Sequence, residues 1–567
     1  MSLVEPLTRL AVQSRCENPD ACETALREAA FQQKSLVAAV LDEKLADETP
    51  FLKGVANWLQ IPWWEESLDT VAAPLRDKIP ARLALRHRII PVRQDEQGVT
   101  LVTFDPFDLL ARQSVSHAVA EPVRWVMSTR TTILQTLRKG YGIGAETFEE
   151  LLEGRDVEDA ALDLRQETQV LDLDDSEASV VKFVNQILRE ALEERATDIH
   201  VEPLQDDLRI RYRIDGVLHE IPVPPKIKVL QASVISRLKI MAHLDIAERR
   251  LPQDGRINLE LEGKPIDVRV ATIPSVVGES ISLRLLGQEI FDFRKLGLDS
   301  DSEARIRSLL AVPNGIVLLT GPTGCGKSTS LYTFLTSLNT HDRRIVTIED
   351  PVEHKLPGVV QIAVKPEIDL TFARGLRSIL RGDPNVIMVG EMRDVETTEI
   401  AIRGALTGHL VFSTLHTNDA IGGITRLIDM GIEPFLVAAS VRSFIAQRLV
   451  RKLCPYCKQP ASHPEAYLAQ AGFPIGHTDK IRKAVGCDHC RHTGYEGRTA
   501  IFEICLVSER LQDMITQRKP AATMKALALE EGMIPLRKSG WKKVIEGVTT
   551  VEEVLRVTTA DVDVLDE

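Results

Sequence analysis

A glycine-rich loop between an apolar segment and a helical pattern constrains this chain more than any other feature. The segment Ile316–Thr320 is apolar enough to form a buried strand, and the run GPTGCGKS, residues 321–328, follows it directly. Leucine and phenylalanine then recur at helical spacing from Leu331 to Leu338. A strand, a GxxxxGK[ST] loop and a helix in this order predict a phosphate-binding loop. Such a loop belongs at the carboxyl end of a strand in a parallel α/β sheet.

Each part of this loop has a chemical role. Glycines allow backbone N–H groups to wrap phosphate oxygens, and the helix N-terminus adds partial positive charge. We expect Lys327 to reach the β and γ phosphates of ATP, and the hydroxyl of Ser328 to join the shell of a Mg²⁺ ion. The predicted nucleotide contacts are Gly321, Pro322, Thr323, Gly324, Cys325, Gly326, Lys327, Ser328 and Thr329.

Three carboxylates are predicted at the ends of neighbouring strands, where hydrolysis needs groups that hold Mg²⁺ and orient water. One apolar segment ends at Glu349, and Glu353 follows shortly after it. A second, Val386–Val389, ends in Gly390-Glu391, with glycine where many P-loop proteins have aspartate. We expect catalytic roles for these three glutamates, and the sequence does not choose the general base among them.

Two histidines flank a third predicted strand of the same sheet, Leu410–Thr414. His409 precedes this strand and His416 follows it. A lone histidine is more often a structural hydrogen-bonding group than a catalyst. Because two histidines flank one strand here, we give a role in sensing the nucleotide or positioning water the same weight as a structural role.

Four cysteines in two CxxC pairs predict a metal site. The pairs Cys454-Pro-Tyr-Cys457 and Cys487-Asp-His-Cys490 are separated by positions 458–486, which are 29 residues. Four thiolates close a tetrahedral Zn²⁺ site and leave no open position, so the metal is expected to be structural. The cysteines outside these pairs are expected to be ordinary thiols, which fits a reducing compartment.

Composition limits the class of protein. A chain of 567 residues with 44% hydrophobic content can bury several cores and should form three or four domains. A net charge of −13 argues against a general nucleic-acid-binding protein, and no specific nucleic acid is expected as a partner. The chain shows neither an apolar run of about eighteen residues nor a signal-peptide pattern, so the expected location is the cytoplasm.

Patterns along the chain predict four parts. An N-terminal α/β domain with a strand at Val99–Phe104 precedes an acidic linker that is poor in aromatic residues. An α+β domain follows, beginning with helical spacing and continuing with alternating segments typical of strands. The last part carries the loop, the cysteines and amphipathic C-terminal helices. We place these parts at 1–141, 142–178, 179–290 and 291–567, with a zinc-binding subdomain at 450–500 and C-terminal helices at 508–567.

Together these motifs resemble the secretion ATPases of type II secretion and type IV pilus assembly. The segments similar to the family's Walker A, aspartate box, Walker B region and histidine box are GPTGCGKSTSLY, TIEDPVE, FARGLRSILRGDPNVIMVGEMRD and GALTGHLVFSTLHTNDA. The segments DIHVEP, YRIDGVL and ERRLPQDGRI and the CxxC pairs also match, and the resemblance covers about residues 179–560. It implies a RecA-like P-loop ATPase domain with a zinc-binding insert, preceded by a PAS-like α+β domain and an N-terminal α/β domain.

The resemblance also implies a homo-hexamer in which each ATP lies between a RecA-like and a PAS-like domain. Arginines that reach across this gap would neutralise charge on the γ-phosphoryl group. On that basis Arg269 and Arg284 are candidate phosphate or finger arginines, and Arg377 and Arg381 match arginines of the family's Walker B region. Ordinary structural ion pairs are the alternative role for each of them.

The first 141 residues are similar to the family's platform-binding N-terminal domain. The implied partners are inner-membrane platform and cytoplasmic-domain proteins of a secretion or pilus machine, with the chain held peripherally at the inner membrane. In some members this domain carries a cyclic-di-GMP motif that opens with RLGxxL. The chain has no such opening, which argues against cyclic-di-GMP binding.

Three functional hypotheses follow. The favoured one is an ATPase that powers pseudopilus assembly for type II protein secretion across the outer membrane, with type IV pilus extension as the alternative. A DNA-translocating motor would share the P-loop and the hexamer, but the acidic charge counts against it. A nucleotide-gated scaffold that barely hydrolyses ATP is also disfavoured, because all three predicted carboxylates are present.

Overall fold

The computed structural model describes residues 3–16, 18–32, 34–66, 68, 71–119, 121–142, 145, 175–224, 227–261, 264–286 and 292–558. It divides the chain into two compact units, Met1–Leu286 and Gly287–Glu567. The acidic linker predicted at 142–178 lies almost entirely outside the described residues.

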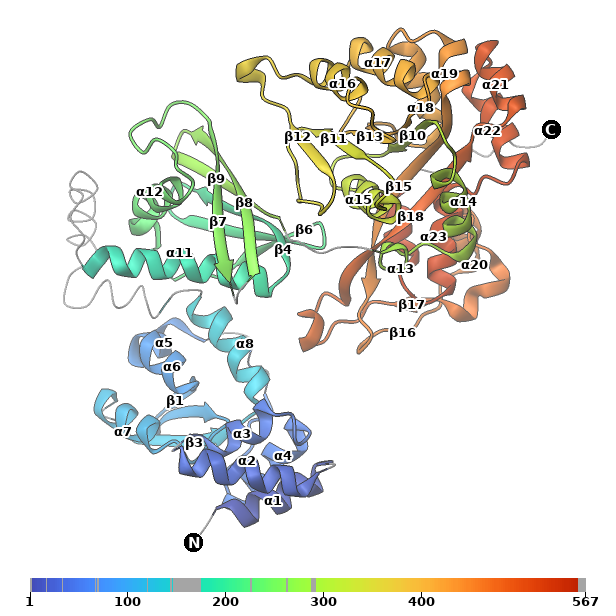
Figure 1. Cartoon of the computed structure of the whole chain (residues 1–567). Helices are drawn as coiled ribbons and strands as arrows, with labels where there is room; N and C mark the ends of the chain where they lie inside the picture. Colours follow the sequence, from blue (N-terminus) through green and yellow to red (C-terminus); the bar gives the residue numbers. More distant parts are fainter. Residues whose placement is uncertain are drawn as a thin grey trace. The chain divides into compact units, whose positions relative to one another are not determined.

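The first unit begins with helices and a small three-stranded sheet (Figure 1). Its elements are α1 (Val4–Gln13), α2 (Pro19–Phe31), α3 (Leu36–Asp42), α4 (Glu48–Leu59), α5 (Ala73–Lys78), α6 (Ala81–His87), β1 (Ile90–Asp95), β2 (Gly98–Thr103), α7 (Leu109–Ala118), β3 (Val123–Met127) and α8 (Arg130–Tyr141). Strand β2 pairs antiparallel with β1 and parallel with β3, and all of its residues are buried. The strand predicted at Val99–Phe104 is therefore confirmed, with its bounds shifted by one residue.

The same unit contains a six-stranded antiparallel sheet in the order β6-β5-β4-β9-β8-β7. The elements are α11 (Asp175–Glu193), β4 (Ala196–Pro203), β5 (Leu208–Ile214), β6 (Val217–Ile221), α12 (Gln231–Met241), β7 (Gln253–Leu261), β8 (Lys264–Ser275) and β9 (Gly278–Leu286). Helix α11 buries Val180, Val184, Ile187, Leu188 and Ala191, which have the helical spacing predicted for the start of this domain. These residues pack in one core with alternating residues of the sheet, as a sheet with one covered face requires.

The second unit is built on a seven-stranded sheet in the order β12-β11-β13-β14-β10-β15-β18. The strands are β10 (Gly315–Thr320), β11 (Ile345–Glu349), β12 (Val360–Ala363), β13 (Val386–Val389), β14 (Leu410–Leu415), β15 (Val441–Leu453) and β18 (Tyr495–Leu506). All neighbours are parallel except β15 and β18. The parallel sheet predicted from the loop is thus confirmed.

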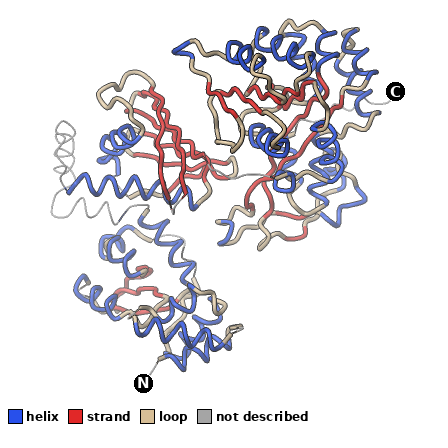
Figure 2. Tube along the Cα trace, in the orientation of Figure 1, coloured by secondary structure: helices blue, strands red, loops and turns tan. Residues whose placement is uncertain are grey.

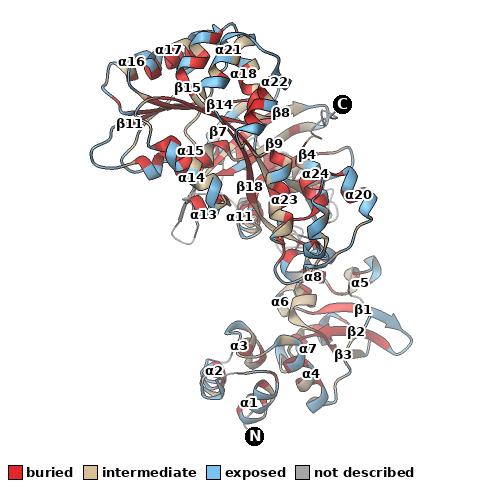
Figure 3. Ribbon diagram, turned by 90° about the vertical axis from the view of Figure 1, so that its right-hand side faces the viewer, coloured by how far each residue is buried: buried red, intermediate tan, exposed pale blue. Residues whose placement is uncertain are grey.

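Helices cover both faces of this sheet, as Figure 2 shows in blue around the red strands. On β10, Ile316 and Leu318 belong to one core, whereas Val317 and Leu319 belong to the other. Figure 3 shows the resulting buried layer along the strands. The helices are α13 (Phe293–Leu296), α14 (Ser300–Leu310) and α15 (Lys327–Leu338) on one face, and α16 (Phe372–Leu380), α17 (Val395–Leu406), α18 (Ala420–Asp429) and α19 (Pro434–Ser440) on the other.

A separate segment lies between β15 and β18, and helices follow β18. This segment contains β16 (Gln459–Pro460), α20 (Glu465–Gln470) and β17 (Arg482–Lys483), which lie between the cysteine pairs, where a small subdomain is predicted. The final helices are α21 (Glu509–Thr516), α22 (Ala521–Glu530), α23 (Leu536–Ile545) and α24 (Val551–Val557), as the amphipathic pattern predicted. Among the residues that the structure describes, no helix has both the length and the apolar content to span a membrane.

Candidate ATP site and cysteine cluster

The predicted phosphate loop connects the fully buried strand β10 to helix α15. Gly321, Gly324 and Gly326 have φ values of 149°, 79° and 87°, a region that side chains rarely adopt. Space also demands glycine at the first position, where a Cβ atom would lie 2.7 Å from the backbone oxygen of Gln447. The base of the loop is therefore fixed, while its tip at residues 322–324 is exposed.

Lys327 is the first residue of α15, and its side chain lies inside the loop. Its Nζ donates hydrogen bonds to the carbonyl oxygens of Gly321, at 2.7 Å, and Pro322, at 3.1 Å. Burial lowers the pKa of this ammonium group, while the nearby carboxylates of Glu391 and Glu353 act in the opposite direction. A buried cation with two carboxylates near it is an arrangement suited to phosphate and Mg²⁺.

Strand β15 supports the loop from the side, which the sequence did not predict. Gln447 is buried, and its Nε2 donates to the carbonyl oxygen of Cys325 at 2.9 Å while its Oε1 accepts from Ser330 Oγ at 2.8 Å. The next residue, Arg448, donates to the carbonyl oxygen of Asn418 at 2.6 Å. The surrounding segment has no motif, so spacing alone could not have identified these residues.

Glu391 lies at the carboxyl end of β13, at the same edge of the sheet as the loop. Its carboxylate is 2.5 Å from the guanidinium of Arg393 and 3.5 Å from Nε2 of His416, which follows β14. The turn that carries it is held to β14, since Thr414 Oγ1 donates to the carbonyl oxygen of Gly390 at 2.8 Å. The structure thus brings Lys327, Glu391 and His416 to one edge.

Glu349 lies at the same edge but points into the protein. It is 5% exposed, and its oxygens accept hydrogen bonds from Thr347, Gln361 and Tyr332. Burial raises its pKa, although these three donors act to lower it. The role predicted for Glu349, a carboxylate acting on water or Mg²⁺, therefore does not match its surroundings, whereas Glu353 follows on the loop after β11.

His409 lies at the opposite edge of the sheet from the phosphate loop. The backbone N–H of Gly315, where β10 begins, donates to its carbonyl oxygen at 3.1 Å. Its ring Nδ1 lies 2.8 Å from the carbonyl oxygen of Gly404, at the end of α17. Because β14 carries its two flanking histidines to opposite edges, His409 lies away from the phosphate loop of its own subunit, and a role for it at a nucleotide stays a prediction.

The predicted arginines lie in two places. Arg377 and Arg381 are exposed on and just after α16, where Arg377 pairs with Glu396 at 2.5 Å. Arg269 and Arg284 are direct cross-strand partners on β8 and β9 of the first unit, so their side chains share a face of that sheet. Their role at a nucleotide stays a prediction.

The four predicted metal ligands form a compact cluster in which the sulfurs all lie within 4.8 Å of one another. The Sγ–Sγ distances of Cys454–Cys487, Cys457–Cys490 and Cys487–Cys490 are 3.8, 3.7 and 3.8 Å. Sulfurs about 2.3 Å from Zn²⁺ at the corners of a tetrahedron are about 3.8 Å apart. The donor set and its spacing therefore fit Zn²⁺.

Backbone N–H groups donate to these sulfurs, although burial still raises the pKa of Cys454 and of Cys457. Gly486 donates to Cys457 Sγ at 3.3 Å, and Cys487 and Gly494 each donate to Cys490 Sγ at 3.2 Å. Burial opposes ionisation of Cys490, but the two N–H groups help lower its pKa to about 7. Such N–H···S contacts are expected around a structural thiolate site.

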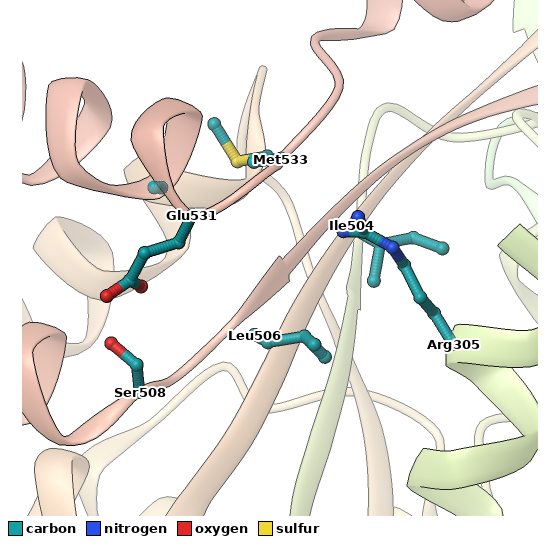
Figure 4. A pocket seen from close by; sticks show the side chains of 7 residues that line it. Arg305, Ile504, Leu506, Ser508, Glu531 and Met533 are labelled. Atoms are coloured by element: carbon teal, nitrogen blue, oxygen red, sulfur yellow. The ribbon is translucent and has the colours of Figure 1, made fainter. Parts of the chain in front are cut away.

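A separate pocket lies at the amino-terminal edge of the strands, near the end of β18. Its walls include Arg305, Ile504, Leu506, Glu531 and Met533 (Figure 4). None of the predicted site residues lines it. This pocket is therefore distinct from the ATP site.

Comparison with known proteins agrees with this geometry. The profile described as "Type II/IV secretion system protein" matches residues 173–556, more than half of the chain, and the profile of the MshEN domain matches residues 59–147. The type II secretion system protein E of Xanthomonas campestris is 44% identical over 483 residues, which cover 84% of each chain. The type II secretion system ATPase E of Vibrio cholerae is 41% identical, over 85% of this chain and 96% of its own.

A pilus protein is equally similar. The type IV pilus assembly ATPase PilB of Myxococcus xanthus is 43% identical over 495 residues, covering 85% of this chain and 86% of its own. Among solved structures, the ATPase DotB of Yersinia pseudotuberculosis aligns with a TM-score of 0.51 at 20% identity, over 67% of this chain and 93% of its own. This last likeness concerns the fold, and it agrees with the predicted RecA-like domain preceded by a PAS-like domain.

Replacing the loop lysine tests the ATP site. We expect Lys327→Ala to lower ATP turnover about 100-fold or more, because a fixed cation facing developing charge contributes that much. The melting temperature should stay close to that of the wild type, since the lysine bonds to carbonyls of its own loop. Phosphate release and thermal unfolding of the purified full chain measure both quantities. Unchanged turnover would remove the loop from the mechanism.

The two histidines provide a matched pair of substitutions on one strand. His416→Ala should lower turnover about 10-fold to 100-fold, because the carboxylate of Glu391 loses a contact that orients it. His409→Ala should leave turnover near the wild-type value, as its ring contacts the opposite edge of the sheet. The steady-state ATP turnover of the two variants is compared at a temperature below the melting temperature of each. Equal losses in both variants would contradict the assignment.

Removing one thiolate tests the cysteine cluster. The wild-type chain should contain about one zinc ion, and Cys487→Ser should lose it, because three thiolates no longer close the site. We expect the melting temperature to fall in parallel. Cys505→Ser, a buried thiol outside the cluster, is the control that should retain its metal. A wild-type chain without zinc on elemental analysis would refute the site.

Proposed function

The chain belongs to the Type II/IV secretion system protein family, and we propose that it is the ATPase that powers pseudopilus assembly for type II protein secretion across the outer membrane. The observation that carries this proposal is the convergence of Lys327, Glu391 and His416 at the carboxyl edge of one parallel sheet. This edge has the groups that ATP hydrolysis needs, and the relatives that match over most of the chain include type II secretion ATPases.

The chain binds ATP through the loop at 321–329. Phosphate oxygens are stronger acceptors than the peptide carbonyls that Lys327 now contacts, so its ammonium turns toward the β and γ phosphates. Ser328 and the nearby carboxylates would hold Mg²⁺, which neutralises charge on the phosphates. Water then attacks the γ-phosphorus, the bond to the bridging oxygen breaks, and ADP and phosphate leave.

We assign the role of general base to Glu391. Its carboxylate contacts Arg393 and His416, and it follows β13 at the edge of the sheet where the phosphate loop lies. Accepting a proton from the attacking water requires an oxygen that is still accessible, and the side chain of Glu391 is 13% exposed. Glu349 lacks this access, because its oxygens are engaged inside the protein.

The working assembly that we propose is a homo-hexamer. In it, Arg269 and Arg284 of one domain and Arg377 and Arg381 of another face the γ-phosphate across the subunit gap. Two features support this: Arg269 and Arg284 share one face of their sheet, and Arg377 and Arg381 are exposed on and just after α16. Hydrolysis then moves the domains against one another.

The proposed partners are the inner-membrane platform and cytoplasmic-domain proteins of the secretion machine. Through them the protein would work in the cytoplasm, at the inner membrane, with the N-terminal domain as the contact. The match of residues 59–147 to the MshEN domain favours cyclic-di-GMP binding by that domain, whereas the missing RLGxxL opening disfavours it. The absence of such binding therefore stays a prediction.

The second candidate is extension of a type IV pilus. It is favoured by the 43% identity to the pilus assembly ATPase of Myxococcus xanthus, which is as high as that to the secretion ATPases. Both functions use the same chemistry, so a biochemical assay does not separate them.

A chromosomal substitution in the source strain separates the two functions. Lys327→Ala at the native locus should abolish the appearance of secreted enzymes in the medium and leave surface pili intact. A strain carrying Cys505→Ser at the same locus is the matched control. Loss of pili with normal secretion would establish the pilus function instead, and loss of neither would contradict both.

A further inference from the structure

Tyr332 connects three elements around the ATP site. It lies on α15, five residues after Lys327, and it is 6% exposed. Its hydroxyl donates to the carboxylate of Glu349 at the end of β11. The same oxygen accepts hydrogen bonds from the backbone N–H groups of Glu353, at 3.1 Å, and His354, at 3.5 Å. One hydroxyl thus ties the helix after the phosphate loop to the segment that carries Glu353.

Gln361 on β12 makes a second connection to the same segment. Its Nε2 donates to Glu349 Oε1 at 3.1 Å and to the carbonyl oxygen of His354 at 2.9 Å. Its Oε1 accepts from the backbone N–H of Leu356 at 2.7 Å. Tyr332 and Gln361 therefore approach the segment after β11 from two sides, and both are bonded to Glu349.

The backbone N–H groups of residues 353 and 354 determine the direction of these hydrogen bonds. An N–H group only donates, so the Tyr332 oxygen accepts from these two groups and its own proton points toward the carboxylate of Glu349. A phenylalanine in place of Tyr332 would leave those N–H groups and one carboxylate oxygen without their partner. Buried polar groups in such a network keep one arrangement because each alternative leaves one of them unsatisfied.

The segment held in this way matters for chemistry because it follows β11, whose carboxyl end lies at the same edge of the sheet as the phosphate loop. The backbone nitrogen of Glu353 lies 3.1 Å from the hydroxyl of Tyr332, on the helix that begins with Lys327. In agreement with this position, the charges of Glu391 and Glu353 oppose the lowering of the Lys327 pKa by burial. A carboxylate on a connecting segment contributes to hydrolysis only if that segment has one conformation. Tyr332 and Gln361 provide this restraint.

We propose that Tyr332, Gln361 and Glu349 are positioning residues that hold Glu353 at the ATP site, and that Glu349 itself does not contact ATP or the attacking water. This inference rests on the proposed ATPase function and assigns different duties to two glutamates of one motif. Glu353 acts on the substrate side, and Glu349 is the buried anchor of the network.

A double-mutant cycle tests this arrangement in the full chain. Tyr332→Phe should lower kcat for ATP about 10-fold to 100-fold, with KM within about threefold of the wild-type value, because binding by the loop is retained. Glu353→Gln should also lower kcat. The double variant should be no slower than the slower single variant, because Tyr332 acts through Glu353. Losses that multiply in the double variant would overturn the proposal.

Two further variants separate this positioning role from general stability. Tyr141→Phe removes another buried hydroxyl, which donates to the carbonyl oxygen of Ile79 in the N-terminal domain, and should leave kcat unchanged. Gln361→Met keeps the length of the side chain and removes the second connection, so it should reproduce the kcat loss of Tyr332→Phe. This variant decides the matter if Tyr332→Phe does not fold, and wild-type kcat in Gln361→Met would then refute the proposal.

The wild-type chain and Lys327→Ala are assayed beside these variants. A wild-type chain without ATP turnover would refute the proposed function itself. Turnover that depends on Lys327 but not on Tyr332 or Gln361 would refute the positioning network alone.

Discussion

The structure of the second unit depends on one constraint. The backbone N–H groups of the phosphate loop must stay available to phosphate at the end of a buried strand. Strand β10 meets this constraint because it is completely buried between β14 and β15 and is covered by helices on both faces. Its parallel neighbours end at the same edge, so the residues that follow them arrive beside the loop. The close approach of Gln447 to Gly321 leaves no room for a side chain at that position, so the first residue of the loop must be glycine.

Buried charges tie the rest of the unit to this edge. Glu503 on β18 is 2% exposed and accepts hydrogen bonds from the backbone N–H groups of Ala420 and Leu536, so it joins the starts of α18 and α23. Burial raises its pKa, and the two N–H groups compensate in part. Burial also opposes ionisation of Glu553 on α24, but Arg556 and Arg451 outweigh it and keep its pKa low. Since Arg451 belongs to β15, that strand carries Gln447 at the phosphate loop, an ion pair to the last helix and, directly after its end, the first cysteine of the metal cluster.

Much of this arrangement could be predicted because its signals are local. The strand, loop and helix from Ile316 to Leu338 are contiguous, and each CxxC pair lies within four residues, so their spacing in the sequence indicated their chemistry. The roles of the glutamates and histidines were harder to predict. Glu349 and Glu391 both follow buried strands, and only the packing of Thr347, Tyr332 and Gln361 around the first shows that it is an internal anchor. Likewise, His409 and His416 look equivalent at the two ends of one strand, yet a strand separates its ends by its full length and only one end meets the loop.

By itself, the sequence determined that this chain has a phosphate loop in a parallel sheet, a four-cysteine metal site and helices with apolar faces, because the residues of the loop, of each CxxC pair and of each helix lie close together along the chain. It also identified Lys327, Glu391 and His416, which the structure brings to the edge of the loop, but it missed Arg393 beside Glu391. Only the tertiary structure decided which of these residues meet, which carboxylate is sealed inside, and that Gln447, more than a hundred residues after the loop, supports it. The physical reason is that hydrogen bonds between distant segments have no period or spacing in the sequence, and they exist only when strand order places the segments side by side.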